Sequence, residues 1–218
     1  MPDPAARPEW ERRFFSAIKP VFDDARPAIQ RGPLSFSWPT FRAQIAAAAK
    51  DQYTETFIAA YLILFFDEGM RRGLELPDMQ PEDLDQIGAQ YGRTMSGRLA
   101  DEIVDKTKAS VGAAVNQETG AITDVEKFDN AFTDNRVEKI AVTETTRSIS
   151  EGEQSAREEM QRTGNREIVA RWVTERDNRV CKICAPLDRK LERVWVDRFP
   201  SGPPAHPNCR CTLFFEVR

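Results

Sequence analysis

All four cysteines and the only histidine of this 218-residue chain lie between residues 181 and 211. They form two clusters, Cys181-x-x-Cys184 and His206-x-x-Cys209-x-Cys211, separated by 21 residues. A Cys-x-x-Cys turn lets two thiolates converge on one tetrahedral ion, and a second cluster closes such a site. The spacing therefore favours a structural zinc site. Two alternatives remain open: two disulfides beside an isolated histidine, and free thiols or a redox pair.

The candidate ligands outnumber the positions, because a structural zinc takes four. Two sets stay open: all four cysteines, or three cysteines with His206. Cys209 and Cys211 lie two residues apart and would face the same side of an extended chain. In the all-cysteine set, His206 is a loop residue that hydrogen-bonds to backbone. Asp177 is expected to cap the turn before the first cluster, or else to orient a ligand.

Composition favours a soluble protein of a reducing compartment. Apolar residues make up 40% of the chain and charged residues 30%, which allows a buried core. Residues 1–4 lack the features of a signal peptide, and the longest apolar run, residues 57–66, is too short for a membrane span. We therefore expect an intracellular protein without a membrane segment, in which disulfides are disfavoured.

The first part of the chain is expected to be helical. Apolar side chains from Trp10 to Phe22 recur at helical spacing and predict a short amphipathic helix. A long helix is expected over residues 40–72, with an apolar and buried second half. Another begins near residue 81, where a proline and two acidic residues open the pattern.

Glycines and turn residues divide the later helices. Gly88, Gly92 and Gly97 interrupt the helix that begins near residue 81, and we interpret them as points of close packing. Residues 110–124 are expected to form a linker. A third long helix is expected over residues 124–161, with Gly152 as a weak point.

The sequence pattern changes after residue 165. Residues 168–173, 194–196 and 212–217 are rich in β-branched and aromatic side chains and predict three short strands. The expected fold class is α+β: a long-helix N-terminal bundle followed by a small zinc-clipped, β-rich C-terminal unit. Such a unit has little core of its own, so zinc would supply much of its folding free energy.

The net charge of −4 is unevenly distributed. Residues 166–218 carry eleven Lys/Arg and seven Asp/Glu, so this part is basic and the rest is acidic. A phosphate-binding surface is one reading, with Trp172 and Trp195 stacking on bases, although their strand pattern favours a place in the core. The basic residues concerned are Arg171, Arg176, Arg179, Lys182, Arg189, Lys190, Arg193, Arg198 and Arg210.

Two strings resemble a known family. Residues 172–188 read WVTERDNRVCKICAPLD and residues 203–211 read PPAHPNCRC. Both are similar to the C-terminal region of phage Mu F-like minor head proteins, the phage head morphogenesis family. Residues 141–147, AVTETTR, resemble the helix that precedes this region, in which an Arg-Thr-Glu run is common. Val142 stands in place of that arginine, and the resemblance covers about residues 137–218.

The resemblance implies a minor capsid or head morphogenesis protein of a tailed phage or prophage. Portal and capsid or scaffold proteins would be its partners, and the virion head and host cytoplasm its locations. We expect a helical region over 1–125 and a head morphogenesis domain over 126–218. No enzymatic activity, small-molecule substrate or membrane partner is expected, because no nucleophile, base and oxyanion donors occur at readable spacing. The alternative is a zinc-containing nucleic-acid-binding module, and packaged DNA is a further candidate partner.

Overall fold

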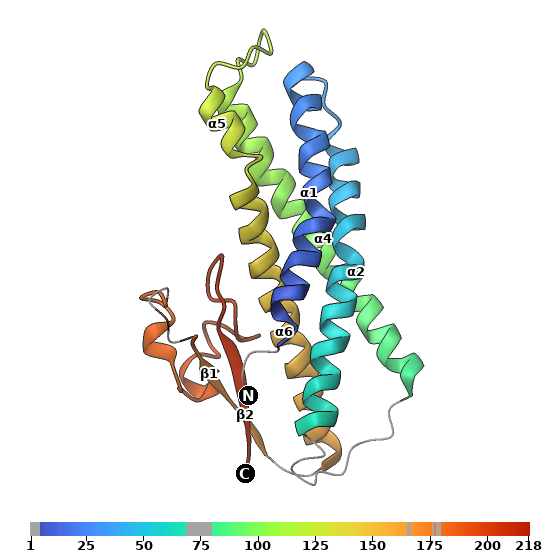
Figure 1. Cartoon of the computed structure of the whole chain (residues 1–218), viewed down its shortest axis with the longest axis vertical. Coiled ribbons are helices and arrows are strands. Elements are labelled where there is room, and N and C mark those ends of the chain that lie inside the picture. Colours follow the sequence, from blue (N-terminus) through green and yellow to red (C-terminus); the bar gives the residue numbers. More distant parts are fainter. Residues whose placement is uncertain (1–4, 69–79, 165–166, 176, 178–179) are drawn as a thin grey trace.

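The computed structural model describes residues 5–68, 80–164, 167–175, 177 and 180–218. Four long helices form an elongated bundle, and a small unit with a two-stranded sheet lies beside the bundle toward one end (Figure 1). In the described part of the chain, no helix is both long and apolar enough to cross a membrane. The expected mixture of a helical bundle and a small β-containing C-terminal unit is therefore confirmed in outline.

The first helix is longer than the sequence predicted. Helix α1 (Arg7–Arg31) continues past Phe22 even though Pro20 and Pro27 lie inside it. Each proline removes a helical hydrogen bond. Ala25 and Ile29 extend the buried face of the helix, and we attribute the continuation to this packing.

Helix α2 (Trp38–Leu62) begins where the Ser37 hydroxyl accepts a hydrogen bond from the amide of Thr40. It continues into a short π-helix, η1 (Ile63–Glu68). The expected burial of its second half is confirmed for most of that half, because Phe57, Ala60, Tyr61, Leu64 and Phe65 are buried, whereas Phe66 near its end is 45% exposed. The last expected residues, 69–72, lie outside the described residues.

The region after α2 differs from the prediction at two boundaries. Helix α4 (Pro81–Ala114) extends into the expected linker, and an isolated bridge between Val115 and Ile122 closes the short loop that follows. The expected third helix is two helices, α5 (Val125–Asn130) and α6 (Asp134–Gly164). The break occurs because the Thr133 hydroxyl accepts from the amide of Arg136, which caps the start of α6.

Close helix packing explains three glycines. A Cβ on Gly88 of α4 would lie 2.5 Å from the side chain of Ile58 of α2. A Cβ on Gly92 of α4 would lie 2.0 Å from Thr54 Oγ1 of α2. A Cβ on Gly152 of α6 would lie 2.4 Å from the carbonyl oxygen of Phe57. Gly152 is therefore a contact point and not the expected weak point. Gly97 was expected to be a third contact in α4, but a Cβ there meets only Arg42, 4.0 Å away.

The C-terminal unit contains two of the three expected strands. Strands β1 (Ile168–Val173) and β2 (Thr212–Val217) pair antiparallel, with Ile168 opposite Val217 and Val173 opposite Thr212. The expected strand at 194–196 is wrong. Glu192–Val194 forms a 3-10 turn, η3, in which Val194 is 56% exposed, while Trp195 is buried and donates from its ring nitrogen to the Lys190 carbonyl.

Two tryptophans build the core of this unit. Trp172 and Trp195 are both fully buried and meet edge to face, with ring centroids 5.6 Å apart. The reading that places them in the core is confirmed, and neither ring surface is free to stack on a base. The expected domain division at residue 125 stays a prediction.

Candidate metal centre

The two cysteine clusters meet at the side of the β unit that faces the bundle. Cys181 and Cys184 lie in the turn before η2 (Ala185–Leu187), and the amide of Cys184 donates to the Cys181 sulfur at 3.4 Å. Asn208 has a φ of 62°, a left-handed conformation that asparagine tolerates well, and it turns the second cluster back toward the first.

All five predicted ligands converge. The side-chain donor atoms form two groups, each within 4.8 Å: Cys181, Cys184 and His206, and Cys184, Cys209 and Cys211. Cys184 belongs to both groups and therefore lies at the centre of the cluster. Such an arrangement of soft donors could hold a metal ion.

His206 presents one ring nitrogen to the thiols. Its Nε2 lies 2.9 Å from the sulfur of Cys181 and 3.3 Å from that of Cys184. Its Nδ1 lies 2.8 Å from the Pro207 carbonyl oxygen. If Nδ1–H donates to that carbonyl, the lone pair of Nε2 points at the cluster, which is how metal-binding histidines are usually held. The expected backbone hydrogen bond exists, and it leaves Nε2 available.

The distances fit a single zinc ion. Zinc–sulfur bonds of about 2.3 Å in a tetrahedron place two sulfurs about 3.8 Å apart. The sulfurs of Cys184 and Cys209 are 3.8 Å apart. The surrounding cavity of about 30 Å³ accommodates an ion and is too small for an organic cofactor. All four cysteines are free thiols in the structure, and this sulfur–sulfur distance far exceeds the roughly 2.05 Å of a disulfide.

The thiols affect each other's protonation. Hydrogen bonds from the thiols of Cys184 and Cys211 hold the pKa of Cys209 far below its usual range. The pKa of Cys184 is raised, first by its hydrogen bonds with Cys209 and Cys211 and then by burial. The thiols of the cluster therefore share protons through these hydrogen bonds. A bound cation would favour release of the remaining protons.

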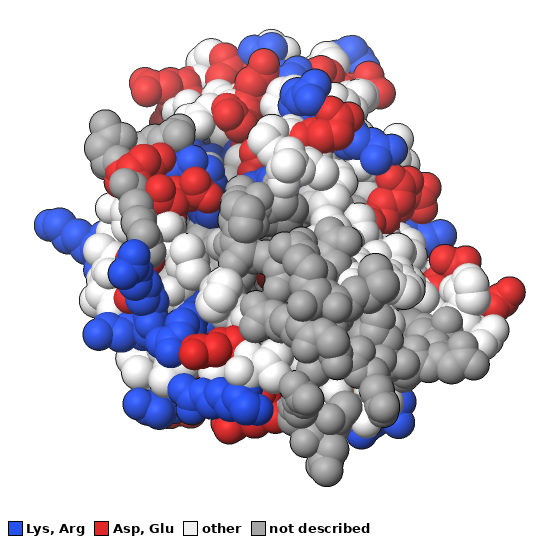
Figure 2. Space-filling model, turned by 60° about the horizontal axis from the view of Figure 1, so that its bottom comes forward, with Lys and Arg blue, Asp and Glu red and all other residues white. Residues whose placement is uncertain are grey.

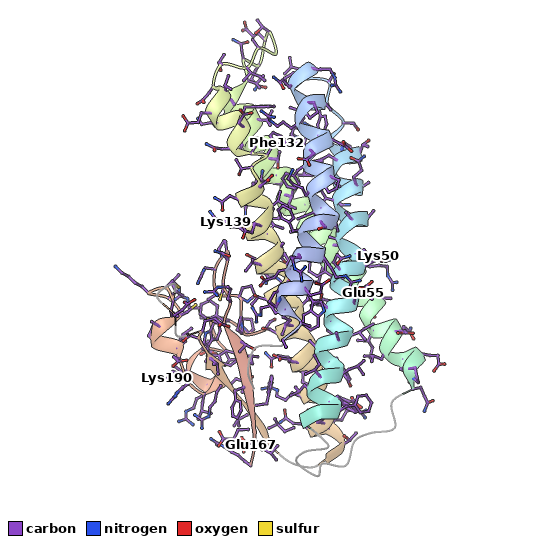
Figure 3. All side chains as sticks on the ribbon, viewed as in Figure 1. Lys50, Glu55, Phe132, Lys139, Glu167 and Lys190 are labelled. Carbon is purple, nitrogen blue, oxygen red and sulfur yellow. The ribbon has the colours of Figure 1, made fainter. Side chains whose placement is uncertain are left out.

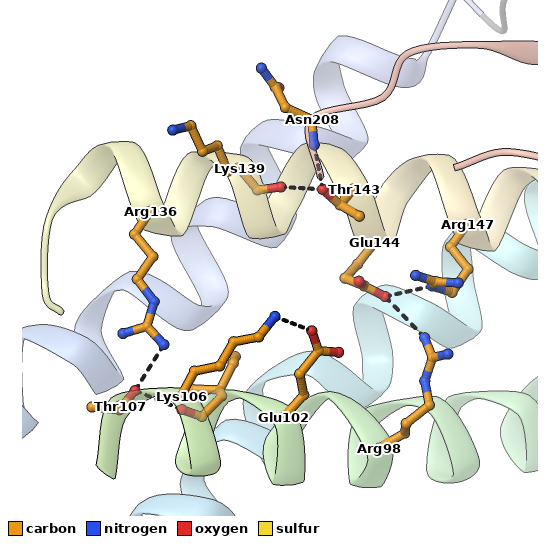
Figure 4. Close-up of polar contacts among 11 residues, drawn as sticks. Arg98, Glu102, Lys106, Thr107, Arg136, Lys139, Thr143, Glu144, Arg147 and Asn208 are labelled. Carbon is orange, nitrogen blue, oxygen red and sulfur yellow. Dashed lines mark hydrogen bonds and ion pairs between the residues drawn. The ribbon is translucent and has the colours of Figure 1, made fainter. Parts of the chain in front are cut away.

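Hydrogen bonds join the second cluster to α6. The Thr146 hydroxyl donates to the Cys209 carbonyl at 2.7 Å. The Thr143 hydroxyl accepts from the amide of Asn208 at 2.8 Å, as Figure 4 shows. Arg7 of α1 is buried and donates to the Thr146 hydroxyl at 2.8 Å and to the Cys211 carbonyl at 3.4 Å. Two helices far apart in sequence, α1 and α6, therefore hold the metal-site loop.

Asp177 supports the same loop. Its carboxylate accepts from Arg210 at 2.6 Å, and Arg210 lies between Cys209 and Cys211. The backbone carbonyl of Asp177 also accepts from the amide of Val180, which agrees with the expected place in the turn. The side chain thus contributes to the position of the ligands through Arg210.

Buried polar contacts continue along α6 beyond the cluster. Glu144 accepts from Tyr53 of α2 at 2.7 Å. It also accepts from Arg147 at 3.0 Å and from Arg98 of α4 at 3.5 Å (Figure 4). Burial, and then the charge of Glu144, raise the pKa of Tyr53. Helix α6 is therefore a polar core element between the bundle and the β unit, and one that the sequence analysis did not predict.

Comparison with known proteins gives a family. The family described as "Phage Mu protein F like protein" matches residues 94–214, more than half of the chain. The chain belongs to the phage Mu F-like family. The match begins within α4, earlier than residue 137 where the sequence resemblance began, and it includes both cysteine clusters. Membership links the chain to phage head morphogenesis, whereas no curated protein and no solved structure matches it.

Proposed function

We propose that the cluster holds one structural zinc through Cys181, Cys184, His206 and one further cysteine. The distance of 3.8 Å between the Cys184 and Cys209 sulfurs supports Cys209 as the fourth ligand. Cys211 is the alternative, because it lies in the same group of donor atoms. Zinc would join the two cysteine loops of the β unit, the second of which is hydrogen-bonded to α6, and would supply folding free energy that the small core lacks.

We further propose that the protein is a minor head protein that acts with the portal and the procapsid during assembly. The family match over residues 94–214 carries this proposal. A metal-stabilised unit beside a long bundle would keep its shape when the protein is incorporated into a larger particle. The proposed locations are the host cytoplasm during assembly and the finished virion head.

The proposed role is in head assembly and not in the catalysis of a reaction. A catalytic zinc keeps an open coordination position and a general base nearby. Here five soft donors compete for four positions, so protein side chains can fill the coordination sphere. The one histidine of the chain lies among these donors and is not paired with a separate nucleophile.

A clean deletion in the parent phage tests the assembly role. We expect normal DNA replication and defective or non-infectious heads, with rescue by the wild-type gene supplied in trans. A tagged copy should co-purify with portal or procapsid proteins. Normal yields of infectious particles from the deletion would contradict the proposal.

A further inference from the structure

The outer segment of the β unit carries four exposed basic side chains. Residues 189–198, which we call the basic segment, contain Arg189, Lys190, Arg193 and Arg198. Among the described residues, no carboxylate forms an ion pair with any of these four. Lys190 extends outward from the unit (Figure 3). Figure 2 shows Lys and Arg gathered along one side of this end of the molecule.

Most carboxylates near the basic segment already form ion pairs or hydrogen bonds with other residues. Glu192 pairs with Arg157 at 2.5 Å, and Glu216 pairs with Arg171 at 2.7 Å. Asp188 accepts from the amide and the hydroxyl of Thr174 at 3.0 and 3.1 Å. Asp197 is the one carboxylate of the segment that stays exposed. The surface charge of the segment is therefore positive, although the whole chain has a net charge of −4.

The main chain that carries two of these cations, Arg189 and Lys190, is held by hydrogen bonds to β1. Strand β1 bonds to the segment twice: the Arg189 amide donates to the Trp172 carbonyl at 2.7 Å, and the Trp172 amide donates to the Lys190 carbonyl at 2.9 Å. Arg198 lies over the ring of Phe199, 5.1 Å from its centroid. A held main chain and a guanidinium that rests on a ring reduce the conformational entropy lost when the segment binds an anion.

We propose that the basic segment binds the phosphate backbone of duplex DNA. This inference rests on the head role proposed above, because a protein inside a phage head would meet the packaged duplex DNA. Binding is independent of sequence and does not favour single strands, since both tryptophans of the unit are buried and unavailable for stacking. An acidic protein fits less well, because interfaces between proteins centre on buried apolar groups and Val194 is the one large exposed apolar side chain of the segment.

Two of the other basic residues are not available for this surface. Arg171 and Arg210 are held in ion pairs with Glu216 and Asp177. Arg176 and Arg179 lie outside the described residues. Lys182 is exposed in the turn of the first cluster and could extend the surface, but the proposal rests on the four cations of the basic segment.

Fluorescence anisotropy of a labelled duplex of mixed sequence, measured from 50 to 200 mM salt, tests the proposal. The variant R189Q/K190Q/R193Q/R198Q removes the four cations. The matched control R31Q/K50Q/R93Q/K108Q removes four exposed cations of the helices, none of which forms an ion pair with a described residue. Circular dichroism checks that both variants stay folded.

We expect wild-type affinity to fall with salt with a log–log slope of about −3 to −4, because up to four phosphates are neutralised. The variant of the basic segment should lose most of this slope and at least about tenfold in affinity at the lowest salt, whereas the control keeps both. No binding by the wild type, or equal loss in the two variants, would overturn the proposal.

Two further probes identify the class of partner. Tighter binding of a single strand than of the duplex would contradict binding through phosphates alone. Equal binding of polyglutamate would assign the surface to an acidic protein. These measurements use the purified chain, so their failure leaves the assembly role untouched, and a normal deletion phenotype leaves the binding result untouched.

Discussion

Thr146 is the residue that most directly joins the metal-site loop to the bundle. Its hydroxyl donates to the Cys209 carbonyl and accepts from Arg7, and it is fully buried. Thr146→Val keeps the shape and leaves both partners with one hydrogen bond fewer. We expect a loss of about 1–3 kcal/mol in the free energy of unfolding, measured by urea denaturation.

Thr94→Val is the matched control, because Thr94 is exposed on α4. It should change the free energy of unfolding by less than about 0.5 kcal/mol. Equal effects of the two substitutions would show that the contact of Thr146 with the loop contributes little to stability.

At the scale of residues, the sequence predicted the ligands but not their supports. The cysteine clusters were readable because soft ligands are rare in the chain and metal geometry restricts their spacing. Arg7 and Thr143 were missed, since the first lies 204 residues from its partner Cys211 and the second resembles any helix-surface threonine. One signal was present in the sequence of α6. Helical spacing places the polar residues Thr146 and Glu153 on the same buried face as Ile149.

At the scale of elements, the contact between α2 and α4 depends on Gly92. A Cβ there would lie 2.0 Å from Thr54 Oγ1 and 2.8 Å from the Lys50 carbonyl oxygen. Gly92→Ala therefore forces the two helices apart, and we expect thermal unfolding to show a loss of about 1–3 kcal/mol.

Gly97→Ala on the same helix is the control for that change. A Cβ at Gly97 lies 4.0 Å from Arg42, its nearest neighbour, so the substitution keeps only the gain in helix propensity. We expect it to be neutral or to stabilise by up to about 1 kcal/mol. A stabilised Gly92→Ala would contradict the close approach of α2 and α4.

Helices and outer strands were predictable because their apolar residues keep a regular period. The break between α5 and α6 was not predictable, since it depends on a capping hydrogen bond that the Thr133 hydroxyl accepts from the Arg136 amide. Residues 194–196 have the composition of a strand. They form no strand because Trp195 packs on Trp172 and bonds to Lys190, which requires a turn.

At the scale of the whole molecule, the site connects the β unit, α6 and the start of α1. Chelation should therefore speed amide hydrogen exchange in residues 180–217 and also in the first turn of α1, where Arg7 bonds to the loop. Amides of α4 from Thr107 to Ala114, at the end of the bundle away from the β unit (Figure 1), should keep their protection. Faster amide exchange throughout the bundle would contradict the prediction that the metal stabilises only the β unit and the start of α1.

The packing of the β unit against α6 was the least predictable feature. It depends on hydrogen bonds between the backbone of residues 208–211 and polar side chains of α6 and α1, and such contacts leave no periodic pattern in the sequence. The family could be read from short strings, because the strings contain the ligands themselves.

Native mass spectrometry of freshly purified protein tests the central claim, that the cluster is one zinc site. The account predicts a mass increase of one zinc ion per chain, lost on strong chelation and absent in Cys184→Ser, because Cys184 belongs to both groups of donors. A metal-free chain whose mass indicates two disulfides would contradict it.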